Sequence, residues 1–478
     1  MKKKLSRLTV KGGVLSPREL KTIIETAEEA GLDSISFGSR QDILFPEIVN
    51  PGMLKALRGM EVVTSVSDKK ENIVSSYVSA DIFPGTGWLT GDRYLYILEQ
   101  FKRTPSLKVN ITDPAQRLVP LFTGHLNFIA SGIEDYWYLH IRLPDWEKKA
   151  EYPALINSWD IEKVASAIED ILPEEPESVM TVFHLLNDSI DTNNRTLDSP
   201  LEVPFHPFPY YEGMNRLGSG KYWLGLYWRN NLYDIRFLKT MCDLCMECKI
   251  GKVCITPWKS FIVKGIPVEF KLDWEKFLGI NGINVRHSML ELNWHVPVGE
   301  DWARELKKYL VGEFDKNDIS TYGLTFGITG YRKKVYYFTS VVIERNTFPR
   351  DIGGISIPDT YNLLYARDFD PNTLEYVVYA QDIDRRELPG LLMELSRMYF
   401  KELGHVKEEV KPKTRKKDKK TYTVYQCGDC LTVYNPEYGD TTQNILPGTA
   451  FGDLPEGYCC PLCEAPKSNY AQREFIKE

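Results

Sequence analysis

The sequence predicts an α+β protein with a body of two related α/β repeats and a small domain at its C-terminal end. A strand–helix–strand pattern in residues 4–45 returns in residues 223–263, which predicts the repeated body. Two C-x2-C pairs within residues 421–478 predict a small domain built around a metal, and the charged residues 404–420 before it are too polar to pack. Hydrophobic residues make up 43% of the chain, which is enough for a sizeable core in the body.

Charge and cysteine usage narrow the class of protein. The net charge of −7 gives no indication of nucleic-acid binding, and no segment approaches the ~20 apolar residues that a membrane span needs. The nine cysteines fall into two groups, which predicts metal sites in a reducing cytoplasm rather than disulfides. No glycine-rich nucleotide motif follows a predicted strand, so we expect redox partner proteins to supply and accept electrons.

The first repeat begins with a predicted strand at residues 4–10. Ser16 and Glu19 form a capping box, with a proline at the first helical position. Apolar residues at helical spacing then predict a helix that ends at Gly31. Residues 34–45 follow as a strand that a small polar turn interrupts.

The second repeat has the same order of elements. Residues 223–227 predict a strand, residues 233–248 a helix, and residues 255–263 a turn and a strand. The helix carries cysteines three positions apart, and one more follows it, so that four thiols lie in a short segment: Cys242, Cys245, Cys248 and Cys254.

Four thiolates in such a segment predict a 4Fe–4S cluster, although the spacing is no standard ferredoxin pattern. When the first repeat is laid over the second without gaps, with Leu20 on Phe237, Cys242 and Cys245 fall on Glu25 and Glu28. A cysteine at an exposed, polar position is poorly explained by packing. Zinc and purely structural thiols are the alternatives.

The turn Gly38-Ser39-Arg40-Gln41 and the segment around Lys108 resemble the duplicated ferredoxin-like half-domains of the sirohaem nitrite and sulfite reductases. The resemblance implies that Arg40 and Lys108 contact sirohaem carboxylates; as isolated residues, both are also ordinary surface charges. The family's second cysteine pair has no counterpart in residues 326–334, where Tyr331 stands. The resemblance therefore gives sirohaem no thiolate link to a cluster. The basic residues 332–334 could bind an anion or form a charged turn.

The C-terminal cysteines form two C-x2-C pairs, Cys427 with Cys430 and Cys460 with Cys463. Such pairs let a tight turn direct two sulfurs at one ion, and they suit zinc as well as iron. Cys459 has the wrong spacing for this turn, so we expect it to be a spare residue that fills space.

Between the pairs, residues 434–440, 445–451 and 453–458 resemble rubredoxin in the order and spacing of their motifs. The resemblance implies one iron bound by the four paired cysteines. Leu431 and Glu464 stand where the family has glycine, which eases a positive φ. The resemblance also implies a small aromatic core of Tyr425, Tyr434, Phe451, Tyr458 and Tyr470.

The remaining patterns complete the predicted organisation. Residues 388–403 predict an amphipathic helix, and residues 290–294 a strand flanked by His287 and His295, which more simply satisfy local hydrogen bonds than bind metal. The predicted segments are a first reductase-like repeat at residues 1–145, a connecting region at 146–215, a second repeat at 216–345, a small α/β extension at 346–403, a charged linker at 404–420 and the rubredoxin domain at 421–478.

Two functions compete on this evidence. The first is an electron-transfer protein in which a mobile rubredoxin iron exchanges electrons with a cluster in the body and serves a partner reductase. The second is an enzyme, a divergent sirohaem-type nitrite or sulfite reductase with its own rubredoxin. A zinc-stabilised scaffold without a redox role is a third interpretation.

Overall fold

The computed structural model describes residues 5–46, 62–63, 70–218, 220–330, 336–346, 351–352, 355–356, 359–403 and 421–476. The chain divides into two compact units: residues 1–217 with 222–404, called the body below, and residues 218–221 with 405–478, which contain the small C-terminal domain. None of the helices in the described ranges has both the length and the apolar character that crossing a bilayer requires.

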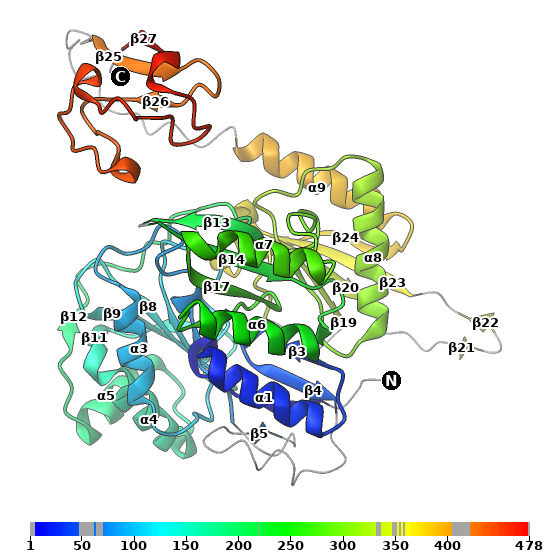
Figure 1. Cartoon of the computed structure of the whole chain (residues 1–478). Helices are drawn as coiled ribbons and strands as arrows, with labels where there is room; N and C mark the ends of the chain where they lie inside the picture. Colours follow the sequence, from blue (N-terminus) through cyan, green and yellow to red (C-terminus); the bar gives the residue numbers. More distant parts are fainter. Residues whose placement is uncertain are drawn as a thin grey trace. The chain divides into compact units, whose positions relative to one another are not determined.

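The two repeats form two five-stranded sheets of the body, and each sheet contains one strand from the other repeat (Figure 1). Tyr233 of β15 pairs with Ile35 of β3, and Leu15 of β2 pairs with Val253 of β16. The first sheet has the order β15-β3-β4-β1-β5, and the second has the order β13-β14-β17-β16-β2. Their bounds are β1 Leu5–Leu8, β2 Val14–Leu15, β3 Ser34–Phe37, β4 Ile43–Pro46, β5 Val62–Val63, β13 Gly213–Leu217, β14 Lys221–Tyr227, β15 Tyr233–Asp234, β16 Val253–Ile255 and β17 Ser260–Pro267.

The predicted duplication is confirmed, and the repeats correspond residue by residue without a gap. Ser16 caps helix α1 (Pro17–Glu29), with the predicted capping box, and Asp234 caps α6 (Ile235–Glu247) in the same way. Behind the helices, Gly31 and Lys249 both have a positive φ, 78° and 57°. The pairing of strands between the repeats follows the same correspondence. Leu15 is equivalent to Tyr233 and Ile35 to Val253, so the pair Leu15–Val253 is equivalent to the pair Tyr233–Ile35.

Helices α1 and α6 lie side by side and share one hydrophobic core (Figure 1). The core faces of both helices are fully buried, including Ile24 and Ala27 of α1 and Met241 of α6. Burying a side chain of this size stabilises the fold by roughly 1.5–3 kcal/mol. This shared core joins the two repeats into one structure.

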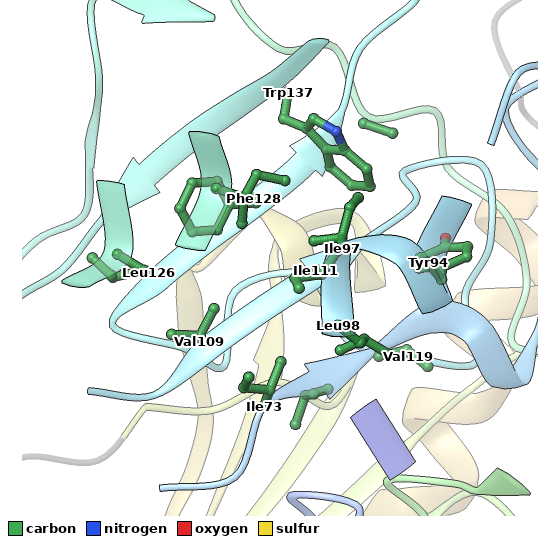
Figure 2. Packing of buried hydrophobic residues seen from close by; sticks show 14 of the residues in the cluster. Ile73, Tyr94, Ile97, Leu98, Val109, Ile111, Val119, Leu126, Phe128 and Trp137 are labelled. Atoms are coloured by element: carbon green, nitrogen blue, oxygen red, sulfur yellow. The ribbon is translucent and has the colours of Figure 1, made fainter. Parts of the chain in front are cut away.

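Two further sheets complete the body. A middle sheet has the order β12-β11-β9-β8-β7-β6, with β10 paired to β9, and packs against α3 and α4 around the core shown in Figure 2. A third sheet has the order β18-β19-β20-β23-β24 and packs against α8 and α9, with a hairpin of β21 and β22 apart from it. The elements are α3 Gly91–Gln100, α4 Ile161–Asp170, α5 Val179–Ser189, α7 Lys271–Ile280, α8 Asp301–Lys316, α9 Leu388–Leu403, β6 Val74–Ser75, β7 Val109–Thr112, β8 Leu126–Ala130, β9 Tyr136–Ile141, β10 Ala150–Glu151, β11 Ala154–Asn157, β12 Arg195–Thr196, β18 Trp294–His295, β19 Phe326–Gly330, β20 Val341–Arg345, β21 Asp351–Ile352, β22 Ile355–Ser356, β23 Thr360–Ala366 and β24 Tyr376–Asp384.

The C-terminal unit contains a three-stranded sheet of β25 (Thr421–Cys427), β26 (Val433–Tyr434) and β27 (Tyr470–Ile476), with β25 in the middle. The predicted aromatic core is confirmed. The rings of Tyr425 and Phe451 stack with centroids 4.1 Å apart, and Tyr434, Tyr458 and Tyr470 pack around them. A domain this short cannot bury a large apolar core, so this aromatic cluster forms its hydrophobic core.

Several other predictions can be compared with the structure. The amphipathic helix at residues 388–403 is confirmed as α9. The strand at residues 290–294 is wrong, because only Trp294 of that range lies in a strand and the residues before it form turns. The predicted domain divisions stay predictions, while the linker and the basic residues 332–334 with Tyr331 lie outside the described residues.

Candidate metal centre and a cationic cavity

Four sulfurs converge in the C-terminal domain. The Sγ atoms of Cys427, Cys430, Cys460 and Cys463 all lie within 4.8 Å of one another. Cys427 ends β25, and Cys460 starts a second, similar turn, so each C-x2-C pair occupies one turn. Four thiol groups around a common point form the donor set of a tetrahedral thiolate site for iron or zinc.

The two turns that carry these pairs have the same backbone. Leu431 donates its amide to the Cys427 carbonyl at 3.1 Å, and Glu464 donates to the Cys460 carbonyl at 2.9 Å. Leu431 and Glu464, the residues that stand in place of glycine, have φ values of 61° and 62°. Both therefore adopt the left-handed conformation, at a cost of about 1 kcal/mol each, to direct the sulfurs inward.

The surroundings of the thiols favour their ionised form at two positions. The Thr432 hydroxyl lies 3.0 Å from the Cys430 sulfur and lowers the pKa of that thiol. Burial raises the pKa of Cys460, but the Tyr470 hydroxyl and nearby backbone amides outweigh it and lower this pKa to about 6. Because thiolates rather than thiols bind metal, these contacts prepare the site.

Cys459 lies outside this group of sulfurs. Its sulfur is 3.9 Å from the Gln443 side-chain oxygen, and its carbonyl accepts a hydrogen bond from the Gln443 amide at 2.6 Å. The residue is half-buried and pairs with Pro466 in an isolated bridge. It therefore supports the turn without joining the four sulfurs.

The second group of cysteines does not form a comparable site. Cys242 and Cys245 lie on α6, Cys248 caps that helix, and Cys254 lies on β16 in a different hydrophobic core. Within the described ranges, the four C-terminal cysteines are the one group of three or more His, Cys, Asp or Glu side chains close enough to share an ion. The 4Fe–4S cluster predicted at Cys242, Cys245, Cys248 and Cys254 stays a prediction, since this comparison concerns sites for a single ion.

A shift of one residue explains why the sequence pointed to a cluster. Because Ser16 corresponds to Asp234, the counterparts of Cys242 and Cys245 are Ile24 and Ala27, not Glu25 and Glu28. The overlay of Leu20 on Phe237 was thus wrong by one position. All four cysteines are buried, and burial raises the pKa of Cys242 to about 12, so the thiol stays neutral. Structural thiols, one of the alternatives, fit these positions.

The body contains a cavity of about 710 Å³ where the repeat turns meet the middle and third sheets. Arg40 and Lys108, the two predicted contacts for carboxylates, both line it. Acidic residues in its described lining are Asp42, which pairs with Arg7 at 3.6 Å, and Glu300. The described lining carries five cationic side chains: Arg7, Arg40, Lys108, Arg142 and Lys259.

Arg40 is held rigidly at the wall of the cavity. Its guanidinium donates to the Asn110 side chain at 2.7 Å and to the Asn72 carbonyl at 2.6 Å. The Nε atom is buried and has no described partner. Burial lowers the pKa of Arg40 to about 10, so the group still carries its charge at neutral pH. A fixed cation at the wall of the cavity is a feature that suits an anionic ligand.

Arg142 also lines the cavity and has the same feature. Its Nε atom is also buried without a described partner, and its guanidinium lies 3.5 Å from the centre of the Tyr336 ring. Nothing in the sequence indicated Arg142, because an isolated charge forms no motif. The guanidinium groups of Arg40 and Arg142 and an excess of basic over acidic side chains in the described lining suit a ligand with several carboxylates.

Lys259, His125 and His295 also line the cavity, and sequence reasoning placed none of them in a site. Burial and the nearby Lys307 lower the pKa of Lys259 to about 7. Burial lowers the pKa of His125 to about 3 and that of His295 well below its usual value, so both imidazoles are neutral. Lys259 could have been found by matching the second turn to the first, whereas the histidines carry no sequence signal.

Comparisons with known proteins agree with this division of the chain. The rubredoxin family model matches residues 424–470. The high molecular weight rubredoxin of Moorella thermoacetica is 38% identical over 129 residues, which are 25% of this chain and 56% of that protein's own length. The probable rubredoxin HupI of Bradyrhizobium diazoefficiens is 52% identical over 48 residues, which are 10% of this chain and 70% of HupI.

The body has a structural neighbour as well. The NirA protein of Mycobacterium tuberculosis superposes with a TM-score of 0.64 at 15% identity, covering 83% of this chain and 81% of the NirA chain. At this identity the likeness shows the fold alone. It confirms the resemblance of the body to the nitrite and sulfite reductases at the level of the fold.

Proposed function

Because the chain belongs to the rubredoxin family through its C-terminal domain, we propose that it is an electron-transfer protein whose C-terminal iron serves redox partner proteins. The convergence of the sulfurs of Cys427, Cys430, Cys460 and Cys463 within 4.8 Å carries this proposal. An iron held by four thiolates supplies one-electron oxidation and reduction. The residues around it act by favouring the ionised form of Cys430 and Cys460 and by fixing the turns that carry the four sulfurs.

The exposed surface beside the sulfurs supports exchange of electrons with another protein. Cys463 is exposed, and the neighbouring Leu431 and Leu462 side chains are 65% and 68% exposed. Two leucines next to a ligand-bearing turn give a partner an apolar surface close to the metal centre.

Metal analysis of the full chain tests this proposal. Protein expressed with iron available is expected to contain one iron per chain at this site and to lose its red-brown colour on addition of dithionite. Material that holds only zinc, with no change in colour on reduction, would refute the electron-transfer role.

A second candidate function follows from the cavity in the body. Here the chain is itself a reductase of the nitrite and sulfite reductase type, and its own rubredoxin domain supplies the electrons. The excess of basic over acidic side chains in the described lining favours it, because it fits a ligand with several carboxylates. Sirohaem is such a ligand, and Arg40, Lys108 and Arg142 would hold its carboxylates. When bound, it supplies a redox-active iron in a flat macrocycle.

The proposal contains no iron–sulfur cluster at Cys242, Cys245, Cys248 and Cys254. No group of three or more sulfurs in the described body lies close enough to share one ion, so the proposal uses the rubredoxin iron alone as the electron donor. A domain linked to the body by a tether raises its own effective concentration there, which supports direct delivery from the rubredoxin.

Absorbance separates the two candidate functions. After subtraction of the rubredoxin spectrum, a tetrapyrrole band in the purified full chain supports the reductase. Absence of such a band, in a strain that makes sirohaem and with the cavity residues intact, leaves the electron-transfer function alone.

A further inference from the structure

We propose that the cavity of the body binds an iron tetrapyrrole through an imidazole nitrogen of His295 as the axial protein ligand. The inference rests on the second candidate function and adds the residue that contacts the iron. It departs from a thiolate-linked arrangement, and four observations lead to it.

The described lining of the cavity supplies no sulfur to an iron. None of the residues that line it is a cysteine or a methionine in the ranges the structure describes. The described lining residues of the kinds that commonly bind haem iron, histidine and tyrosine, are His125, His295, Tyr336 and Tyr337, whereas the amine of Lys259 is engaged with the Val296 carbonyl. A macrocyclic iron in this cavity would take its protein ligand from this set.

His125 is occupied by a hydrogen bond. Its Nδ1 atom accepts the backbone amide of Lys108 at 3.1 Å. In a neutral imidazole, a ring whose Nδ1 accepts carries its proton on Nε2. Neither nitrogen of His125 then offers a lone pair to a metal.

Both tyrosines are occupied as well. Tyr337 donates its hydroxyl to the Glu344 carboxylate at 2.6 Å, which stabilises the protonated phenol. Tyr336 donates to the Trp146 carbonyl at 3.1 Å, and its ring lies against Arg142. A phenolate ligand would have to give up these contacts.

His295 remains, and the fold holds its ring in place. It lies on β18, which pairs in parallel with β19, so that His295 is opposite Gly327. The imidazole meets the Phe338 ring edge to face, with centroids 4.6 Å apart. His295, Gly327 and Phe338 all line the cavity. A ligand residue held by packing on a strand has the fixed orientation that metal binding needs.

Binding forms one bond, from an imidazole lone pair to the iron, and needs no oxidant or reductant. The change from a thiolate to an imidazole replaces a negatively charged ligand with a neutral one, which alters both the spectrum and the reduction potential. The two coordination modes can therefore be distinguished without measuring activity.

The experiment adds sirohaem, and in parallel ferric haem, to the full chain and records difference absorbance and electron paramagnetic resonance. The wild-type protein is expected to give the spectrum of an iron with nitrogen axial ligation. His295→Gly should lose that signal, and added free imidazole, which can enter the space left by the ring, should restore it. His287→Gly is the matched control, because His287 lies outside the cavity lining and pairs with Glu212.

Each outcome has one meaning. A nitrogen-ligated spectrum that is unchanged in His295→Gly overturns this inference but leaves the reductase candidate standing. Failure of the wild-type chain to bind either probe overturns both, while a rubredoxin colour that bleaches with dithionite would still support electron transfer. Circular dichroism of each variant confirms that a lost signal does not come from a lost fold.

Discussion

Gln41 and Lys259 occupy the same position in the two repeats of the body, and both have a left-handed backbone, with φ of 58° and 60°. The two turns have the same pair of backbone hydrogen bonds. In the first, Gly38 donates to the Asp42 carbonyl and Gln41 to the Gly38 carbonyl; in the second, Thr256 donates to the Ser260 carbonyl and Lys259 to the Thr256 carbonyl. Their side chains differ in role. Gln41 bonds to the Ser75 backbone and to the Ile255 carbonyl, whereas Lys259 lines the cavity. One repeat thus uses the turn to join strands, and the other uses it to place a cation.

The placement of Lys259 predicts a stability that depends on pH. Its pKa is about 7 in the fold, because of burial and Lys307, and 10.5 without those effects. The unfolded chain therefore binds more protons between these values, and the contribution of Lys259 to stability rises as pH rises from 7 to 10.5. Lys259→Met removes the charge, so the stability of the wild type relative to this variant should increase between pH 7.5 and 9.5 in urea unfolding. A difference independent of pH would contradict a lowered pKa.

Cysteine variants test the ligand set at the C-terminal centre. Cys460→Ser removes one of the four converging sulfurs, so the iron–thiolate absorbance should be lost or strongly changed. Cys459→Ser is the matched control, because the adjacent sulfur lies outside the group, and the colour should remain. Equal loss in both variants would show that the four-sulfur assignment is wrong.

The left-handed turns predict that a glycine stabilises the domain. Leu431→Gly removes the Cβ from a residue with φ of 61°, so the holoprotein should gain about 1 kcal/mol against unfolding, measured by loss of the iron–thiolate colour in denaturant. Leu462→Gly is the control, since Leu462 is equally exposed, follows Cys460 in the second turn and has no positive φ. It should not be stabilised, and a similar gain in both variants would refute a role for backbone strain.

The correspondence of the repeats predicts that the cysteines of α6 are replaceable. Cys245→Ala introduces the residue that stands at the equivalent position, Ala27, in a shared core. The free energy of unfolding should fall by less than about 1.5 kcal/mol, and the iron content per chain should not change. Loss of iron in this variant would restore the case for a cluster in the body.

Much of the local structure could be predicted because it depends on neighbours in the chain. The capping box at Ser16, helix α9 and the C-x2-C turns rest on interactions within a few residues, and each is found where it was expected. Which side of α6 its cysteines occupy could not be predicted, for the opposite reason. Deciding whether Cys242 faces solvent or core required the register between two helices far apart in the sequence, and an error of one residue reversed the answer.

By itself, the sequence determined that this chain has a duplicated body and a terminal domain with two metal-binding turns, because spacing along the chain specifies both. Only the tertiary structure decided that the thiols of α6 are buried and that Arg40, Lys108, Arg142, Lys259 and His295 surround one cavity. These residues come from strands and turns of different sheets, and the burial that sets their charge and reactivity exists only when those sheets have packed together.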